Sequence, residues 1–595
     1  MTRLLKTILP IILCALFGLS FASPTQAVAS LPIILPALTC DALSATDFSA
    51  AVGAKVTINH TEMQTSAQGS WCKVSATIAP EIGVQIALPT QRWSQRFLQV
   101  GCGGLCGSIN LSLSNASGCL PAMNGEFVVA ATDMGHHGSM MDASWAEDPQ
   151  KRIDFAWRAN HLTAVLAKAV MQTLYRQPPK YAYFMGCSDG GREALMEAQR
   201  FPQDFDGISA GAPAAFFQFQ NSFFHGWNVA ANQRPDGTAI LLKNRLPLIH
   251  QAVLAHCPTL SGVQDGILQN PYACQFSESW LPRCPADARD RSTCLTQEEI
   301  EVVKKLYRGA YDSHGAQFVA GGLPLGSELR WPVPETPTGH SMSEMMVLPA
   351  LQSVLLPGEK QKIQSMRDFP LNQQNFDAVA QLAPLYNAAN TNLHAYQQRG
   401  GKLILWHGLA DDSVSPAFSI AYYRGVEAEM GHAATDTFLR LFLLPGVAHC
   451  GNGEGYDQID LLTPLMRWTE EGIAPQEIMA GKRATAAADL PHHAVLHGGF
   501  GRDGVREFQR RVVGFEQAVA VAEPGERAGK RSARRHREGQ RVRLSGEQLH
   551  GRGRHCRAQV APQLFQRDFA VIVHIRFRLA IQPKTAGKRA GKVRN

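Results

Sequence analysis

The chain has 595 residues, of which 45% are hydrophobic and 18% are charged, and it carries a formal net charge of +7. This length allows several domains or one large α/β core with insertions, and it supplies enough apolar residues for a substantial buried core. Beyond residue 29 no apolar stretch is long enough to cross a bilayer, which excludes a protein with several membrane-spanning helices.

The N-terminus has the pattern of a secretory signal peptide. Arg3 and Lys6 precede an apolar run over residues 8–21, and small residues follow that run. The alternative, a membrane anchor, needs about 20 apolar residues, whereas this run is shorter and contains a proline and a glycine. We therefore expect residues 1–27 to be a signal peptide, and the mature chain to be soluble and either secreted or periplasmic.

Strands and a glycine-rich loop come next along the chain. Short runs of alternating polar and apolar residues between positions 40 and 89 predict half-exposed strands, and residues 96–100 predict another strand. The loop Gly101-Cys102-Gly103-Gly104-Leu105-Cys106-Gly107 follows directly. It is not a phosphate-binding loop of the common type, because no Gly-Lys-Ser/Thr follows it.

A βαβ unit leads to the most informative motif. Residues 126–133 predict a strand, residues 153–176 a long amphipathic helix, and residues 181–187 a further strand, so the sheet is expected to be largely parallel. The last strand runs into Gly186-Cys187-Ser188-Asp189-Gly190, and good helix formers follow. A strand, a sharp G-x-S-x-G turn and a helix expose a nucleophilic serine in α/β-hydrolases. Ser188 is thus the candidate nucleophile, in an α/β fold with a mostly parallel sheet flanked by helices.

Residues 214–399 interrupt the alternation of strands and helices. This segment is rich in Pro, Gly, Asn and aromatic residues and contains four cysteines. Strands are expected immediately before it, near residues 205–213, and immediately after it, at residues 402–406. We interpret the segment as a lid domain that is inserted into a catalytic domain spanning residues 28–483.

Two polar side chains follow the strands beyond this insertion. The first strand leads to His407-Gly408-Leu409-Ala410-Asp411-Asp412, and a strand at residues 438–444 leads to Pro445-Gly446-Val447-Ala448-His449. An acid after one strand and a histidine after the next give the chain order Ser, Asp, His of α/β-hydrolases. Asp411 and His449 therefore complete a candidate triad, with Asp412 as the alternative acid.

The candidate triad predicts the chemistry of a serine esterase. His449 takes the proton of Ser188 as the hydroxyl attacks an ester carbonyl, while Asp411 fixes the imidazole tautomer and stabilises the imidazolium. No organic cofactor is needed for this reaction, which proceeds through an acyl-enzyme.

The glycine loop precedes the nucleophile, where an α/β-hydrolase supplies part of its oxyanion hole. We expect the backbone N–H of Asp189 and one from Gly103 or Gly104 to hold the oxyanion. The alternative for this loop is an ordinary tight turn.

The cysteines indicate disulfides. Of the 13 cysteines, eleven lie between Cys40 and Cys450, a density that is typical of exported proteins. The spacings do not give two C-x-x-C pairs, and Cys102, Cys106 and Cys119 have no histidine at a zinc-ligand spacing. The sequence therefore gives no indication of a zinc site.

These residues together resemble the tannase/feruloyl esterase family, which includes hydrolases of terephthalate monoesters. Cys187-Ser188, Asp411 and His449-Cys450 are similar to the Cys-Ser, Asp and His-Cys arrangement of that family. The resemblance covers roughly residues 40–482. It implies that the lid covers the site and forms most of the pocket for an aromatic acid.

The resemblance also implies a disulfide between Cys187 and Cys450, which ties the segment of the nucleophile to that of the base. Sequence order suggests the further pairs Cys40–Cys72, Cys257–Cys274 and Cys284–Cys294. Cys106–Cys119 is an additional suggestion, which leaves Cys102 and Cys556 unpaired.

The lid departs from the family at a calcium loop of the pattern Cys-Asp-x-x-Asp-Gly-x-x-Asp-Gly. The corresponding stretch here is Cys257-Pro258-Thr259-Leu260-Ser261-Gly262-Val263-Gln264-Asp265-Gly266, so Asp265 is the one carboxylate left. Calcium affinity follows the number of charged ligands, and we expect calcium to bind weakly or not at all. The alternative is that water and backbone carbonyls compensate.

The composition changes abruptly after Lys482. Residues 484–595 carry 23 Lys and Arg against 9 Asp and Glu, a net charge of +14, whereas residues 1–483 carry −7. Basic runs are typical of nucleic-acid binding, but no aromatic residues are interleaved with them and no binding module is recognised, so no specific nucleic-acid partner is expected. High net charge with little apolar periodicity predicts disorder. Because the family's cysteine-containing C-terminal segment is missing here, our hypothesis is that a frameshift replaced the native C-terminus.

The sequence thus predicts a secreted or periplasmic serine esterase that acts on small esters of aromatic or phenolic acids. Feruloyl, galloyl and terephthaloyl esters are all open, and so is the oligomeric state. No membrane partner is expected. The alternative is a secreted, catalytically inactive binding protein of the same fold, because the altered lid and C-terminus could leave a misassembled site.

Overall fold

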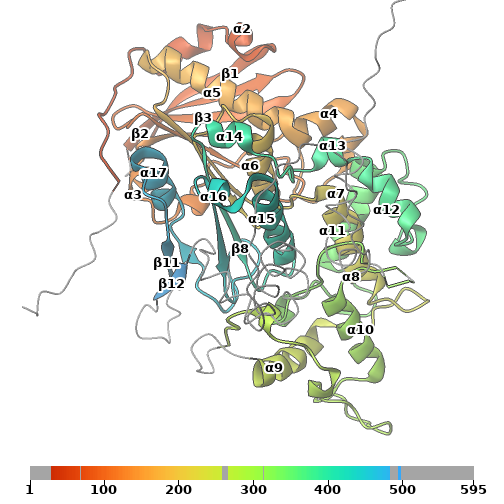
Figure 1. Ribbon diagram of the computed structural model, residues 1–595. Coiled ribbons are helices and arrows are strands. Elements are labelled where there is room, and N and C mark those ends of the chain that lie inside the picture. The colour runs from red at the N-terminus through yellow and green to blue at the C-terminus, as the bar shows by residue number, and fades with distance from the viewer. Residues whose placement is uncertain are drawn as a thin grey trace, which may run out of the picture.

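The computed structural model describes residues 28–66, 69–257, 266–312, 314–315, 317–482 and 493–497 (Figure 1). The predicted signal peptide, most of the calcium loop with Asp265, Cys556 and nearly all of the basic C-terminal segment lie outside these residues. Within the described ranges, no helix is both long enough and apolar enough to span a membrane.

A nine-stranded mixed sheet forms the centre of the fold, with the strand order β1-β2-β3-β5-β4-β6-β7-β8-β9. The strands are β1 (Val56–Ser66), β2 (Gly69–Ile78), β3 (Ile82–Pro89), β4 (Arg96–Val100), β5 (Phe127–Thr132), β6 (Tyr181–Cys187), β7 (Gly207–Gly211), β8 (Lys402–Gly408) and β9 (Leu439–Leu444). The pairs β1–β2, β2–β3 and β3–β5 are antiparallel, whereas the six strands from β5 across to β9 pair in parallel. The predicted parallel sheet thus carries an antiparallel extension at its N-terminal edge.

Helices cover both faces of the parallel part. Successive side chains of a strand point to opposite faces. In β6, Phe184 packs into the core beneath α5 (Ala159–Tyr175), α6 (Asp189–Arg200) and α15 (Pro416–Met430), while Tyr183 and Met185 pack into a second core. The second core is closed by α3 (Leu120–Met123) and α17 (Leu462–Glu471). The predicted α/β fold with flanking helices is confirmed.

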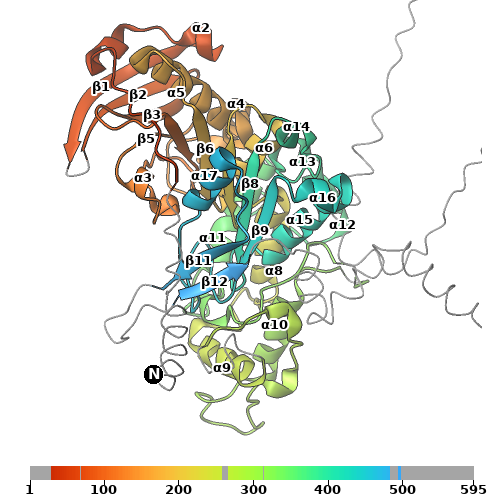
Figure 2. The same ribbon diagram turned by 60° about the vertical axis from the view of Figure 1, so that its left-hand side comes forward.

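The segment between β7 and β8 is helical in its described part and adds no strand to the sheet. It contains α7 (Phe217–Phe219), α8 (His225–Ala230), α9 (Leu246–His256), α10 (Gln297–Arg308), α11 (Met342–Pro349), α12 (Gln373–Ala380), α13 (Ala383–Tyr386) and α14 (His394–Gln398). Figures 1 and 2 show α9 and α10 at the opposite end of the molecule from β1. The segment lies between two strands of the sheet, and its role as a lid stays a prediction.

Local sequence signals fix parts of the insertion. Helix α10 begins at a capping box, in which the Thr296 side chain accepts from the Glu299 N–H and the Glu299 side chain accepts from the Thr296 N–H. The loops around it are long, and the disulfides Cys257–Cys274 and Cys284–Cys294 close two of them. These crosslinks restrict the unfolded chain in a region where the described residues have only an isolated β-bridge, between Arg283 and Leu295.

Five disulfides occur in the described residues, and four were predicted: Cys40–Cys72, Cys187–Cys450, Cys257–Cys274 and Cys284–Cys294. The fifth joins Cys102 to Cys106, so the suggested Cys106–Cys119 pair and the unpaired state of Cys102 are wrong. The physical reason is the loop's backbone, in which Gly104 and Cys106 take φ angles of 60° and 61° and fold the chain back on itself. Cys119 is a buried free thiol beside Met466.

A small second sheet ends the described chain. It consists of β10 (Gln458–Ile459), β11 (Glu477–Gly481) and β12 (His493–His497), all antiparallel. β12 lies inside the basic segment that was expected to be disordered, so that expectation is wrong for these five residues. Their pairing with β11 supplies the regular structure that the composition did not indicate.

The remaining short helices are α2 (Ser49–Val52), α4 (Pro149–Ile153) and α16 (His432–Thr435). The long helix predicted at residues 153–176 is composite, because a π-helical turn, Asp154–Arg158, joins α4 to α5.

Candidate active site

Ser188 lies at the sharp turn between β6 and α6. Its φ of 66° and ψ of −121° are unfavourable for a residue with a side chain, which is the strained geometry of a nucleophile elbow. The turn is held by backbone hydrogen bonds, since the Ser188 N–H donates to the Gly211 carbonyl at 3.0 Å and the Ser188 carbonyl accepts from the Ala214 N–H at 3.1 Å. The structure thus places Ser188 as the sequence predicted.

His449 and Asp411 are hydrogen-bonded to each other. Nδ1 of His449 lies 2.8 Å from Oδ2 of Asp411. A carboxylate only accepts hydrogen bonds, so Nδ1 carries the proton and the lone pair of the imidazole is on Nε2. Ser188 and His449 line the same cavity. With the proton on Nδ1, His449 has the tautomer that a general base at Nε2 requires.

The Asp411 carboxylate is buried and held by four donors. Oδ1 accepts from the N–H groups of Ser413 and Val414, both at 2.9 Å, and Oδ2 accepts from His407 Nε2 at 3.1 Å as well as from His449. His407 was not singled out in the sequence, because a histidine at the end of a strand has no local signal of function. These bonds fix the carboxylate plane and hence the imidazole.

The pKa values of Asp411 and its neighbour Asp412 are shifted in opposite directions. Desolvation opposes ionisation of Asp411, but the charge of His449 and the hydrogen bonds of His407 and His449 hold its pKa well below the usual range. Burial, and then the charge of Asp411, raise the pKa of Asp412 to about 7. Desolvation lowers the pKa of His449, yet the charge and hydrogen bond of Asp411 outweigh it, so that pKa is raised. Asp411 is therefore better suited than Asp412 to orient the base.

The Cys187–Cys450 disulfide joins the residue before Ser188 to the residue after His449. The two Cα atoms lie 5.9 Å apart and are separated by 263 positions in the chain. This covalent link restricts the distance between the elbow and the loop of the histidine.

Residues with unpaired backbone N–H groups line the cavity next to Ser188. Among the described residues, the N–H groups of Asp189, Gly103 and Gly104 donate no hydrogen bond, and all three residues line the cavity. The glycine loop lies directly on the elbow, since a Cβ at Gly190 would lie 2.8 Å from the Cys102 carbonyl oxygen. Unpaired N–H groups on two touching segments suit an oxyanion hole.

The cavity has a volume of about 500 Å³, within the range of small-molecule sites. Its remaining walls are largely uncharged and come from three parts of the chain. The loop after β4 gives polar groups and the loop after β5 and the insertion give mostly apolar ones: Ser108, Asn110, Ser112 and Ser114; Met140 and Met141; and Phe217, Gln220, Asn221, His225, Met342 and Met346. Desolvation, and then the charge of His449, lower the pKa of His225 to about 3, so His225 is neutral near pH 7. Among the described lining residues there is no Lys or Arg. The sequence did not identify these residues, because no motif marks a lid wall.

Among the described residues, two groups of largely buried side chains lie close enough together to be considered as metal ligands. The first contains Cys102, Cys106, Asp189 and Glu193. Both of its sulfur atoms are in a disulfide and carry no thiolate charge, and Asp189 is paired with Arg192. A metal therefore has few free ligands here.

The second group contains His161, Glu197 and Asp204. The His161 ring is already hydrogen-bonded to Asp204 at 2.6 Å, and Lys168 binds the same aspartate. Asp265, the carboxylate left in the degenerate calcium loop, lies outside the described residues.

Comparisons with known proteins identify the family of the chain. A family model described as "Tannase and feruloyl esterase" matches residues 65–496, which extends past Lys482 and includes most of β12. A probable feruloyl esterase of Arthroderma benhamiae is 33% identical over 433 residues, covering 69% of this chain and 78% of that protein. A mono(2-hydroxyethyl) terephthalate hydrolase of Piscinibacter sakaiensis is 28% identical over 480 residues, with coverage of 69% and 78%.

Solved structures show the same fold. The crystal structure of feruloyl esterase B from Aspergillus oryzae is similar with a TM-score of 0.64 at 24% identity, covering 77% of this chain and 96% of that one. Tannin acyl hydrolase from Aspergillus niger gives a TM-score of 0.63 at 22% identity, with coverage of 79% and 93%. Because the family model matches well over half of this chain, the chain belongs to the tannase and feruloyl esterase family and is a serine esterase.

Proposed function

We propose that the protein is an exported esterase that hydrolyses esters of aromatic or phenolic carboxylic acids, with Ser188 as nucleophile, His449 as base and Asp411 as its orienting acid. The observation that carries the proposal is the hydrogen bond from His449 to the buried Asp411 at the wall of a cavity that Ser188 also lines.

In the proposed reaction, His449 Nε2 accepts the Ser188 proton as Oγ attacks the ester carbonyl. The N–H of Asp189 and one from Gly103 or Gly104 stabilise the oxyanion, and His449 then gives its proton to the leaving alcohol. Water attacks the acyl-enzyme by the same route and releases the acid. Asp411 stays ionised throughout, because its low pKa keeps the carboxylate charged.

The cavity walls support an aromatic acyl group. Phe217 and the methionines at positions 140, 141, 342 and 346 give the site polarisable apolar surfaces, and thioether sulfur makes favourable contacts with aromatic rings. The described lining has no Lys or Arg to pair with the second carboxylate of a terephthalate monoester. We therefore expect uncharged feruloyl and galloyl esters to have the higher kcat/KM.

The export of the protein is supported by two features. The N-terminal sequence has the pattern of a signal peptide, and the five disulfides of the described chain need an oxidising compartment to persist. A secreted or periplasmic location satisfies both.

The test compares the hydrolysis of ferulate, gallate and terephthalate monoesters by the wild-type protein, by Ser188→Ala and by Ser279→Ala, an exposed serine of the insertion that serves as control. We expect ferulate and gallate esters to turn over at least about tenfold better than the charged terephthalate ester, a difference of about 1.4 kcal/mol. Ser188→Ala should lose several orders of magnitude in kcat. A folded wild-type protein that cleaves none of the three would favour the inactive binding protein.

A further inference from the structure

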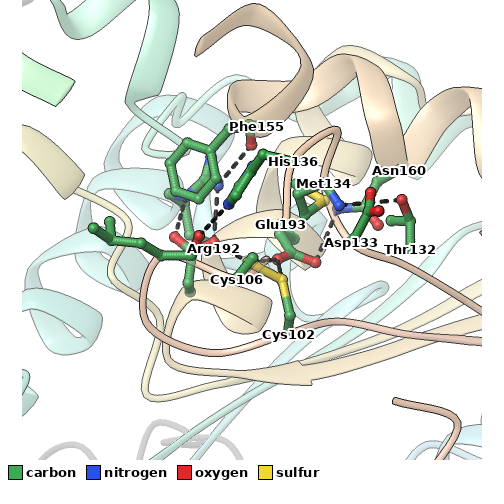
Figure 3. Close-up of a disulfide and its surroundings, with 12 residues drawn as sticks. Cys102, Cys106, Thr132, Asp133, Met134, His136, Phe155, Asn160, Arg192 and Glu193 are labelled. Atoms are coloured by element: carbon green, nitrogen blue, oxygen red, sulfur yellow. Dashed lines mark hydrogen bonds and ion pairs between the residues drawn. A yellow bond between two sulfur atoms is a disulfide. The ribbon is translucent and has the colours of Figure 1, made fainter. Parts of the chain in front are cut away.

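A buried carboxyl group that takes no part in the triad lies behind the glycine loop. Glu193, in the second turn of α6, is 2% exposed. Figure 3 shows its carboxyl group beside the Cys102–Cys106 disulfide, near Asn160 and Arg192. Oε1 of Glu193 is 2.8 Å from Cys102 Sγ and 3.5 Å from Cys106 Sγ. The group therefore touches the loop that carries Gly103 and Gly104.

Hydrogen bonds identify which oxygen of Glu193 is the acceptor. Gln99 Nε2 donates to the backbone carbonyl of Asn160 at 3.1 Å and to Asn160 Oδ1 at 2.9 Å. A carbonyl only accepts, so the Gln99 amide is oriented with its NH₂ toward Asn160, and the Asn160 NH₂ then points away. That NH₂ donates to Glu193 Oε2 at 2.9 Å. Oε2 is thus the accepting oxygen.

The other oxygen, Oε1, faces atoms that have no proton to give. Cys102 and Cys106 are joined in a disulfide, so neither sulfur carries a hydrogen. The Asp189 carboxylate is close by and is already paired with Arg192, whose Nε and Nη2 donate to it at 2.6 and 3.0 Å. A charged Glu193 would meet lone pairs and a second carboxylate there. The favoured state is the neutral acid with its proton on Oε1.

The surrounding charges agree with this assignment. Burial, and then the charge of Asp189, raise the pKa of Glu193 to about 8. The charge of Arg192 and the hydrogen bond from Asn160 oppose this rise. Glu197, one turn further along α6, is a buried acid that also interacts with Glu193. In the described part of the chain, the contacts that Glu193 makes outside α6 are with uncharged groups, namely Asn160 and the disulfide.

Glu193 also touches the contact between loop and elbow. A Cβ at Gly101 would lie 2.7 Å from Gly190 Cα and 2.8 Å from Glu193 Oε2, so the three groups are packed without free space. The loop above this contact carries the unpaired N–H groups of Gly103 and Gly104, and the first turn of α6 carries that of Asp189. The position of one donor relative to the other depends on this contact.

We propose that Glu193 is a positioning residue of the oxyanion hole. As an uncharged carboxylic acid it joins the Cys102–Cys106 loop to α6, and its ionisation weakens that contact and slows acylation. This inference rests on the proposed function of Ser188 and its oxyanion hole. It adds a residue that touches neither substrate nor nucleophile and acts through the loop.

The kinetic test uses Glu193→Gln, Glu193→Leu and the control Glu197→Gln, with kcat and KM measured against pH for an uncharged aromatic ester. Wild-type kcat should fall at alkaline pH with an apparent pKa near 8. Glu193→Gln cannot ionise, so it should lose this alkaline decline and keep kcat at pH 7 within about threefold of the wild-type value. Glu193→Leu should lose on the order of 10- to 100-fold in kcat with little change in KM. Glu197→Gln, which removes a buried acid from the same helix, should keep the decline.

A second readout does not depend on turnover. The infrared difference between wild-type protein and Glu193→Gln at pH 7 should contain the C=O stretch of a protonated carboxylic acid, and that signal should vanish above the pKa of Glu193. An unchanged alkaline decline in Glu193→Gln, wild-type kcat in Glu193→Leu, or no carboxylic-acid signal would each overturn the inference. If Ser188-dependent turnover is present and one of these results is found, the inference alone fails. Absence of Ser188-dependent turnover would refute the proposed function, and the positioning role with it.

Discussion

Replacing Asp411 by Asn changes one atom of the triad and tests the tautomer argument. The amide oxygen of the new side chain would keep the two backbone donors, the N–H groups of Ser413 and Val414, that Asp411 Oδ1 binds at 2.9 Å. Its NH₂ group would then face His449 Nδ1 and His407 Nε2, which both donate in the native site. His449 must therefore move its proton to Nε2 in order to accept from the amide at Nδ1.

This tautomer cannot act as the base, since the proton occupies the nitrogen that should take the Ser188 hydrogen. The substitution should lower kcat by about 10⁴-fold, which corresponds to about 5.4 kcal/mol of transition-state stabilisation. KM should change little, because the lost interaction belongs to the transition state rather than to substrate binding. The fold should persist, because the backbone bonds of residue 411 are kept.

The assay measures kcat and KM for a ferulate ester, with thermal unfolding as the check on folding. The matched control is Asp412→Asn, which changes the adjacent acid but leaves the bond from Asp411 to His449 in place. We expect this control to keep kcat within about tenfold of the wild-type value. Near-normal activity in Asp411→Asn together with collapse in Asp412→Asn would refute the assignment of the acid.

Four further predictions concern the disulfide, the base, calcium and the C-terminus. In the double variant Cys187→Ser/Cys450→Ser, the free energy of unfolding should be about 2–5 kcal/mol lower and kcat about 100-fold lower; an unchanged denaturation curve and unchanged kinetics would contradict this. Neutral His449 is the active form and its pKa is raised, so kcat/KM should increase with pH and reach half of its maximum above about pH 6.5. A half-maximum below that pH would contradict the raised pKa. A calcium chelator should leave Tm unchanged, and a clear decrease would show that the degenerate loop still binds the ion. One of the two alternative reading frames beyond Lys482 should encode an uninterrupted, cysteine-containing continuation; if neither frame does, the basic segment is a genuine extension.

The parts of the fold that depend on local pattern could be predicted from the sequence. The turn at Ser188 was predictable because strand, glycine spacing and helix formers adjoin it. The order of Asp411 and His449 followed from the two largely apolar strands that precede them. The Cys187–Cys450 disulfide was predictable from the resemblance to the family, because the two cysteines are the sequence neighbours of Ser188 and His449. These features are short-range or are fixed by chain order in this fold.

The features that the sequence did not reveal depend on tertiary contacts. Glu193 belongs to a helix of ordinary composition, and nothing near it in sequence shows that the glycine loop and Asn160 bury it. The Cys102–Cys106 bridge depends on left-handed backbone angles within a short loop, whereas the sequence analysis suggested the more distant Cys119 as the partner of Cys106. The cavity walls from the insertion carry no motif, because apolar lining residues have the same composition as any core.

Covalent labelling with a serine-reactive phosphonate, followed by intact mass and peptide mapping, identifies the nucleophile without depending on the choice of ester. We expect one equivalent of label on Ser188 and none in Ser188→Ala. Labelling should be much slower in His449→Ala, because the base that activates the hydroxyl is then missing. A well-folded wild-type protein that takes up no label, or that is labelled at another residue, would contradict the assignment of Ser188 as the nucleophile.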